Sequence, residues 1–198
     1  MLRKQLRPAI VLTLLLCVVT GLVYPGIVTG LAQVLFARQA NGSLIKSSKG
    51  AVIGSELIGQ SFSKPEYFHP RPSAAGTGYD DTLSTGTNLG PTSAKLADTL
   101  IAQAVDSTVK NDGAVKGSIP ADYVTSSASG LDPHISPASA FLQVARVARA
   151  RHADSASVRA LVDKHIEARQ FGFFGEARVN VLLLNLDLDH TMPLSAAK

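Results

Sequence analysis

AIVLTLLLCVVTGLVYPGIVTGLAQVLF, residues 9–36, is the stretch that decides the architecture. It contains no Asp, Glu, Lys or Arg. A helix needs about 20 apolar residues to cross the hydrocarbon core of a bilayer, and this run exceeds that length. It also exceeds the ~7–15 apolar residues of a cleavable signal peptide, and no small-x-small cleavage site precedes Arg38. We therefore predict a retained transmembrane helix over residues 9–36.

The charges on either side of this run predict its orientation. Three cations crowd the seven-residue N-terminal tail, namely Arg3, Lys4 and Arg7. Three more follow the helix: Arg38, Lys46 and Lys49. A long domain crosses the membrane largely regardless of its charge, so the short basic tail should decide. We expect residues 1–8 to form a cytoplasmic basic tail and residues 37–198 an extracytoplasmic globular domain.

Two glycines within the apolar run are spaced so that another helix could approach closely. Gly26 and Gly30 form a small-xxx-small pattern, the kind of face at which membrane helices pack. Glycine is also simply frequent in such helices. Both interpretations stay open at this point, and Pro25 is expected to kink the helix.

Charge and cysteine content narrow the class of the domain. The N-terminal tail supplies +3 of the formal net charge of +4, so the domain itself is nearly neutral. Binding to a nucleic acid backbone is therefore not expected. Cys17 in the apolar run is the single cysteine, which excludes disulfides within the chain.

Periodicity and turn residues predict a single α/β domain, with α+β as the alternative, in which at least three helices surround a small sheet. Ser136 should cap a helix that begins at Pro137, and its cations Arg146, Arg149 and Arg151 are expected on a solvated face. The other predicted elements are short strands within 39–60, an ordered partner-facing loop over 61–93, a helix over 92–111 ended by Gly113, a strand at 123–125, a helix capped by Ser155, and a central strand over 178–189.

No group of residues indicates catalysis. A phosphate-binding Gly-rich loop with Lys-Ser/Thr and a nucleophile elbow are both absent from the sequence. His69 and His134 lack the spacing of helical metal ligands, and we interpret them as structural. Weak similarity to a nucleotide-binding loop of transporter-type ATPases is confined to Leu83, Ser84, Thr85 and Gly86.

The long loop carries the candidate partner interface. Tyr67, Phe68, Arg71 and Asn88 stand among prolines and glycines that fix the backbone. Aromatic and Arg side chains dominate the binding energy of protein interfaces. We expect these four residues to face a partner.

Four stretches resemble one family. They are YFHPRPSAAG (67–76), STGTNLGPTS (84–93), SGLDPHISP (129–137) and GEARVNV (175–181). With one anchor ahead of them, the chain resembles the C subunit of the bacterial Kdp potassium-transporting ATPase. Departures from the family pattern are small: Thr87 stands where Ser is expected, Ala177 where Pro is usual, and a tail over 190–198 extends past the usual end.

The resemblance implies a non-catalytic accessory subunit of an ATP-driven potassium importer in the inner membrane. Its implied partners are a channel-like potassium-translocating subunit and a P-type ATPase subunit. The family's C subunit is needed for assembly and acts as a catalytic chaperone that raises the ATP affinity of the ATPase subunit. No cofactor of its own is implied, since the complex handles ATP and potassium. The alternative is a membrane-anchored periplasmic enzyme or binding domain. An extracytoplasmic domain would not contact cytoplasmic ATP directly, so the predicted topology argues against direct contact.

Overall fold

The computed structural model describes residues 2–194 and divides the chain into two compact units, Met1–Ser55 and Glu56–Lys198. The first unit holds a long helix and a β-hairpin, and the second holds several helices and a three-stranded sheet. The predicted mixture of helices and small sheets behind one apolar helix is confirmed. The second unit begins at Glu56. A globular domain that starts at residue 37 stays a prediction. Positions 195–198 of the predicted tail lie outside the described residues.

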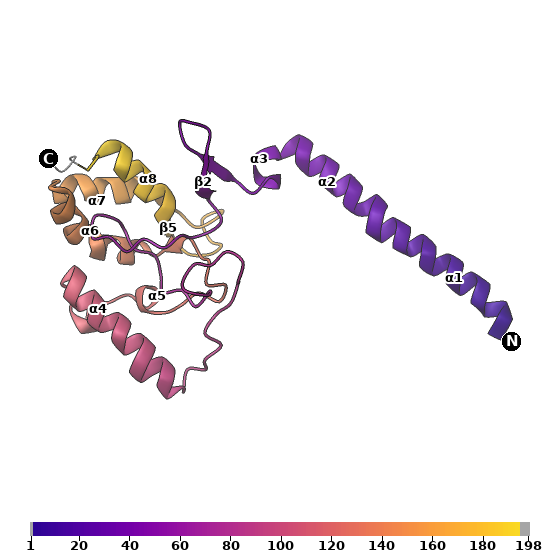
Figure 1. The fold of residues 1–198 in the computed structure, drawn as a ribbon, viewed down its shortest axis with the longest axis horizontal. Helices are drawn as coiled ribbons and strands as arrows, with labels where there is room; N and C mark the ends of the chain where they lie inside the picture. Colours follow the sequence, from indigo (N-terminus) through magenta and orange to yellow (C-terminus); the bar gives the residue numbers. More distant parts are fainter. Residues whose placement is uncertain (1, 195–198) are drawn as a thin grey trace. The chain divides into compact units, whose positions relative to one another are not determined.

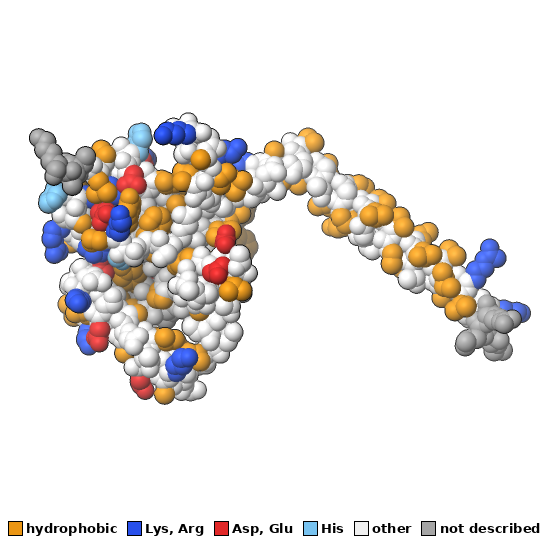
Figure 2. Space-filling view, in the orientation of Figure 1, with side chains coloured by type: hydrophobic (Ala, Val, Ile, Leu, Met, Phe, Trp, Pro, Cys, Tyr) orange, Lys and Arg blue, Asp and Glu red, His pale blue; other side chains and the backbone are white. Residues whose placement is uncertain are grey.

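The N-terminal helix is continuous and apolar. It consists of α1 (Leu2–Val18), a π-helical turn η1 (Val19–Val23) and α2 (Tyr24–Leu35). The segment Lys4–Leu35 is long and apolar enough to cross a membrane. Figure 2 shows apolar side chains along the whole helix, with Lys and Arg side chains beside its two ends.

The π-helical turn lies immediately before Pro25, where the helical hydrogen-bond ladder must adjust. Proline has no N–H to donate, so the ladder loses a bond at this point. The Tyr24 N–H bonds the Val19 carbonyl instead, in the wider π-helical pattern. A Cβ added at Gly26 or Gly30 would meet nothing within 4 Å, so the space beside both glycines is open within the described chain. A helix-docking role for them stays a prediction.

A short helix and a hairpin complete the first unit. Helix α3 (Ala37–Ala40) is followed by strands β1 (Leu44–Lys46) and β2 (Val52–Ser55), which pair antiparallel. The Ser55 hydroxyl donates to the Gly42 carbonyl at 2.7 Å and closes the base of the hairpin. The predicted short strands within residues 39–60 are confirmed.

The second unit is built on a three-stranded antiparallel sheet with three helices packed beside it. The strands are β3 (His134–Ile135), β4 (Ile166–Glu167) and β5 (Arg178–Asn180), in the order β3-β5-β4. Figure 1 shows helices α6 (Pro137–Arg151), α7 (Ser155–Lys164) and α8 (Val181–Thr191) close together. The largest apolar side chains that are fully buried in this core are Phe68, Ile135, Val147, Val158, Val162, Val179, Val181, Leu184 and Leu188.

The predicted strand over 178–189 is wrong beyond its first three residues. Strand β5 is central in its sheet, as predicted, but it ends at Asn180 and the chain continues as α8. The Asn180 side chain accepts a hydrogen bond from the Leu183 N–H and so caps the helix. A continuous apolar run fits a buried strand or a buried helix equally well, so periodicity could not separate the two.

Two further local predictions need correction. Residues 123–125 are not a strand, because α5 (Ala121–Val124) is a single helical turn. Helix α7 is capped by Asp154 rather than Ser155, and the Asp154 carboxylate accepts from the Ser157 N–H at 3.0 Å.

The helix predicted over 92–111 is confirmed. It is formed by η2 (Lys95–Ile101) and α4 (Ala102–Asp112). Gly113 ends it with φ of +69°, a left-handed conformation that glycine adopts without steric cost. The cap of α6 is also as predicted, because the Ser136 hydroxyl accepts from the Ser139 N–H at 3.1 Å. A short 3-10 turn, η3 (Lys116–Ser118), follows α4.

Candidate partner-binding surface

Arg146 holds the start of the long loop against helices α4 and α6. Its Nε donates to Asp112 Oδ1 at 2.7 Å, and its Nη1 donates to the carbonyls of Pro65 and Tyr67 at 2.6 and 2.8 Å. The two charged side chains are 6% and 2% exposed. The expected solvated face is therefore wrong at this position. A buried ion pair with every partner in place fixes the loop, and removal of one partner would leave a buried charge.

Arg151, the last residue of α6, also binds the long loop, so the expected solvated face is wrong at this position as well. Its side chain is fully buried, and its Nη2 donates to Asp189 Oδ1 at 2.7 Å. Its Nε donates to the Glu66 carbonyl at 2.7 Å, and its guanidinium lies 4.9 Å from the centre of the Tyr67 ring. The Tyr67 hydroxyl donates to Asp189 Oδ2 at 3.1 Å. Tyr67 is thus part of an intramolecular network, and a contact with a partner stays a prediction for it.

Two buried amide side chains each hydrogen-bond both the N–H and the carbonyl of one loop residue, as the backbone of a neighbouring β-strand would. Asn185 Oδ1 accepts from the Phe68 N–H, and Asn185 Nδ2 donates to the Phe68 carbonyl, both at 2.9 Å. Gln143 bonds the N–H and carbonyl of His69 in the same way, at 2.7 and 3.1 Å. Buried backbone groups need partners, and these amides supply them where no strand is available. Phe68 is thereby held fully buried in the core, so its expected place on a partner-facing surface is wrong.

Arg71 joins the long loop to the loop before β3. Its Nη1 lies 3.1 Å from Asp132 Oδ2, and its Nε and Nη2 donate to the carbonyls of Thr125 and Ser126 at 3.3 Å. Asp132 also accepts from the His134 N–H at 3.0 Å, as expected for an Asp that stabilises its own turn. Burial alone would raise the pKa of Asp132, but the bonds from His134 and the Arg71 charge outweigh it and lower that pKa. About a fifth of the Arg71 side chain remains exposed, so its predicted contact with a partner stays open.

The stretch Leu83, Ser84, Thr85 and Gly86 packs against the backbone of a second loop. A Cβ at Gly86 would lie 2.8 Å from the Ala128 carbonyl oxygen, and one at Gly130 would lie 2.6 Å from the Thr85 oxygen. Close packing of the two backbones accounts for both glycines. Nucleotide binding at this stretch stays a prediction. Asn88 follows on the exposed surface with φ of +53°, a conformation that Asn tolerates better than most residues.

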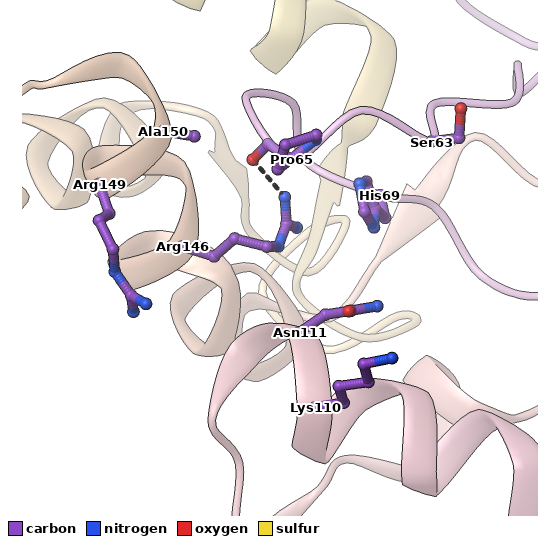
Figure 3. A pocket seen from close by; sticks show the side chains of 8 residues that line it. All are labelled: Ser63, Pro65, His69, Lys110, Asn111, Arg146, Arg149 and Ala150. Carbon is purple, nitrogen blue, oxygen red and sulfur yellow. Dashed lines mark hydrogen bonds between the residues drawn. The ribbon is translucent and has the colours of Figure 1, made fainter.

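A cationic cavity of about 460 Å³ opens between the long loop, α4 and α6. In Figure 3, Lys110 and Asn111 of α4 lie across from Arg146 and His69. Burial and the nearby Arg146 charge lower the pKa of His69, whose Nε2 lies 3.0 Å from the Lys64 carbonyl oxygen. No carboxylate lines this cavity among the described residues. Its electrostatics suit an acidic group better than a cation.

An exposed aromatic cluster that the sequence did not predict lies in the loop that joins β4 to β5. Phe171, Phe173 and Phe174 are 87%, 66% and 58% exposed. The rings of Phe173 and Phe174 lie 4.2 Å apart, centre to centre. The local sequence FGFFG could have drawn attention to it, since a glycine-flanked aromatic run has no helical or strand period.

Comparisons with known proteins show the family. The sequence model of the family described as K+-transporting ATPase, c chain, matches residues 6–190. A potassium-transporting ATPase KdpC subunit from Gemmatimonas aurantiaca is 60% identical, over 94% of this chain and 92% of the relative. KdpC subunits from Koribacter versatilis and Geobacter sulfurreducens are 53% and 49% identical and are covered over 97% and 100% of their lengths. The chain therefore belongs to the KdpC family, the c chains of K⁺-transporting ATPases, and is a subunit of a potassium-transport complex.

Proposed function

We propose that this chain is a non-catalytic accessory subunit of an ATP-driven potassium importer and is needed for assembly of the complex. Its partners in this proposal are a channel-like potassium-translocating subunit and a P-type ATPase subunit. The family match over residues 6–190 carries the proposal, because it covers nearly all of the anchor and of the body. The internal use of the charged groups supports it, since Arg146, Arg151 and Asp112 hold the loop rather than line up an acid–base pair.

The finer role we propose is to raise the affinity of the ATPase subunit for ATP. A complex reconstituted without this chain should need a higher ATP concentration for half-maximal potassium-dependent ATPase activity. The measurement is an ATP titration of the reconstituted complex with and without the chain. Unchanged ATP dependence and unchanged assembly in its absence would contradict the proposal.

A matched variant separates this proposal from the alternative of an anchored periplasmic enzyme or binding domain. His69→Ala with His134→Ala removes the histidine of the long loop and the histidine of β3. An accessory subunit with these replacements should still support potassium-dependent ATPase activity in every complex that assembles. Normal assembly with complete loss of transport would indicate chemistry or ion binding at the histidines and would favour the alternative.

We also propose that the anchor spans the inner membrane once, with the N-terminus in the cytoplasm and the body in the periplasm. The cations Lys4 and Arg7 lie at the start of the segment Lys4–Leu35, and short basic tails stay in the cytoplasm. Gly26 and Gly30 would then offer a packing face to a helix of another subunit.

A reporter enzyme that is active only outside the cytoplasm should be active when fused after Lys198. The long body crosses the membrane behind the anchor, so the fused reporter would follow it. A second fusion to a reporter active only in the cytoplasm is the control and should be silent. The reverse pattern would overturn the orientation and would restore direct ATP contact as a possibility.

A further inference from the structure

Three phenylalanine side chains form an exposed apolar tip on the body. Phe171, Phe173 and Phe174, here called the phenylalanine tip, stand in the loop that joins β4 to β5. Phe171 is the most exposed large apolar side chain among the described residues, at 87%. Scattered exposed apolar residues are ordinary, but here the Phe174 ring lies 4.2 Å from that of Phe173 and 6.5 Å from that of Phe171, centre to centre. Three exposed aromatic rings gathered at one tip mark an interaction surface.

The backbone of the tip is fixed rather than free. The Gln170 and Phe174 backbones exchange two hydrogen bonds of 2.9 Å, and the Gly172 N–H donates to the Arg169 carbonyl at 3.1 Å. Phe171 has φ of +53°, in the left-handed region that a bulky side chain rarely adopts. Such strain persists where the surroundings enforce it, and it is concentrated at functional sites. The loop therefore presents its rings in a defined arrangement.

The charged side chains at the base of the tip form two Arg–Glu ion pairs. Arg178 Nε donates to Glu167 Oε2 at 2.9 Å, and Arg169 pairs with Glu176. Each of these two cations therefore has a carboxylate beside it, and in the loop as the structure describes it no unpaired cation accompanies the aromatic rings. A receptor for this surface would be apolar and uncharged.

We propose that the phenylalanine tip docks into an apolar, uncharged pocket on a neighbouring subunit of the transport complex. The fixed arrangement of the three rings favours a protein over a lipid surface as the receptor. A protein pocket rewards a fixed ring arrangement, whereas a fluid bilayer has no fixed shape to match, and anionic lipids would favour the unpaired cations that this base lacks. Exposed aromatic anchors are the side chains that carry most binding energy in protein interfaces. The inference rests on the proposed function in that it requires a multi-subunit complex.

Photo-crosslinking in the intact complex identifies what occupies the tip. With p-benzoylphenylalanine at position 173, irradiation of membranes that contain the whole complex should give a covalent adduct with another subunit. The same probe at position 115 is the control, because Val115 is also exposed, at 73%, but stands alone after α4. An adduct with lipid or with a second copy of this chain, or no adduct while the complex still co-purifies, would overturn the inference.

A charge placed on the tip tests its contribution to affinity. Phe173→Asp with Phe171→Asp should weaken the binding of the chain to the rest of the complex by about 30-fold or more, the change expected when an interface hot spot is lost. Val115→Asp is the matched control and should leave binding unchanged. Both sites are exposed, so the fold should tolerate the changes, and circular dichroism of each purified chain checks this.

The two failures can be told apart. Binding of the tip variant at wild-type strength would overturn the docking role and leave the accessory-subunit proposal intact. A wild-type chain that fails to co-purify with the other subunits would instead contradict the proposed function.

Discussion

Replacement of Asp112 by Ala should lower the free energy of unfolding of the chain by about 3–5 kcal/mol. Asp112 is the last residue of α4, and its carboxylate lies 2.7 Å from Arg146 Nε with both side chains almost fully buried. It also accepts a hydrogen bond from the Tyr123 hydroxyl at 3.2 Å, and burial together with the Asp112 charge raises the pKa of that tyrosine. Truncation would leave a buried guanidinium without its counter-charge and a buried phenol without its acceptor.

An exposed ion pair between Asp106 of α4 and Lys116 of η3 is a matched control. Asp106 lies 2.8 Å from Lys116 Nζ, and their side chains are 67% and 70% exposed. Exposed pairs contribute at most about 1 kcal/mol, so Asp106→Ala should be nearly neutral. Urea unfolding of the full chain in mild detergent, followed by the near-ultraviolet circular dichroism of its tyrosines, would measure both variants. Similar small losses for Asp112→Ala and Asp106→Ala would contradict the buried pair.

A double replacement shows whether stability requires the two charges themselves or only that neither charge is left buried without its partner. Asp112→Leu with Arg146→Met removes both charges together, and apolar replacements of a whole buried pair are often neutral. The double variant should therefore be more stable than Asp112→Ala. Arg146 also bonds the carbonyls of Pro65 and Tyr67, so the loop should nevertheless become more mobile. Amide hydrogen exchange over residues 61–79 would detect that loosening.

The anchor and the start of α6 could be predicted from the sequence because their signals are local. The apolar run of 28 residues is itself long enough to indicate a membrane-spanning helix. Ser136 followed by Pro137 marks the start of α6. Residues 181–191 gave no such signal. The run VLLLNLDLD has no helical stripe because α8 is buried on several sides, and only the Asn180 cap distinguishes it from a strand.

The candidate surface could not be predicted in the same way, because its contacts join distant parts of the chain. Asn185 binds the backbone of Phe68 from 117 positions away, and Arg151 reaches Glu66 from 85 positions away. A cation near a helix end is usually solvated, so the sequence pattern favoured that interpretation for Arg146 and Arg151. Only the fold reveals that the carbonyls of Pro65, Glu66 and Tyr67 lie beside Arg146 and Arg151 and accept their hydrogen bonds. The aromatic side chains of the long loop, Tyr67 and Phe68, are predicted to bind a partner because the local sequence does not show which distant residues pack against them.

Phe68→Ala should lower the free energy of unfolding by about 3–5 kcal/mol, the usual cost of deleting a buried phenylalanine ring. The ring is fully buried among the side chains of the core, and the backbone of the residue is bonded on both sides by Asn185. The cavity left behind would weaken the packing of the loop against α6 and α8. Urea unfolding of the full chain measures the loss.

Tyr67→Phe is the control for this prediction, since it changes the neighbouring residue without opening a cavity. It removes only the bond from the Tyr67 hydroxyl to Asp189, which is worth about 1 kcal/mol. The two variants also separate a core residue from an interface residue. A core Phe68 predicts that any loss of subunit association in Phe68→Ala follows the loss of stability and disappears at low temperature, where the variant is folded. Weakened association in a Phe68→Ala chain of wild-type stability would place this ring in the subunit interface, as the sequence alone suggested.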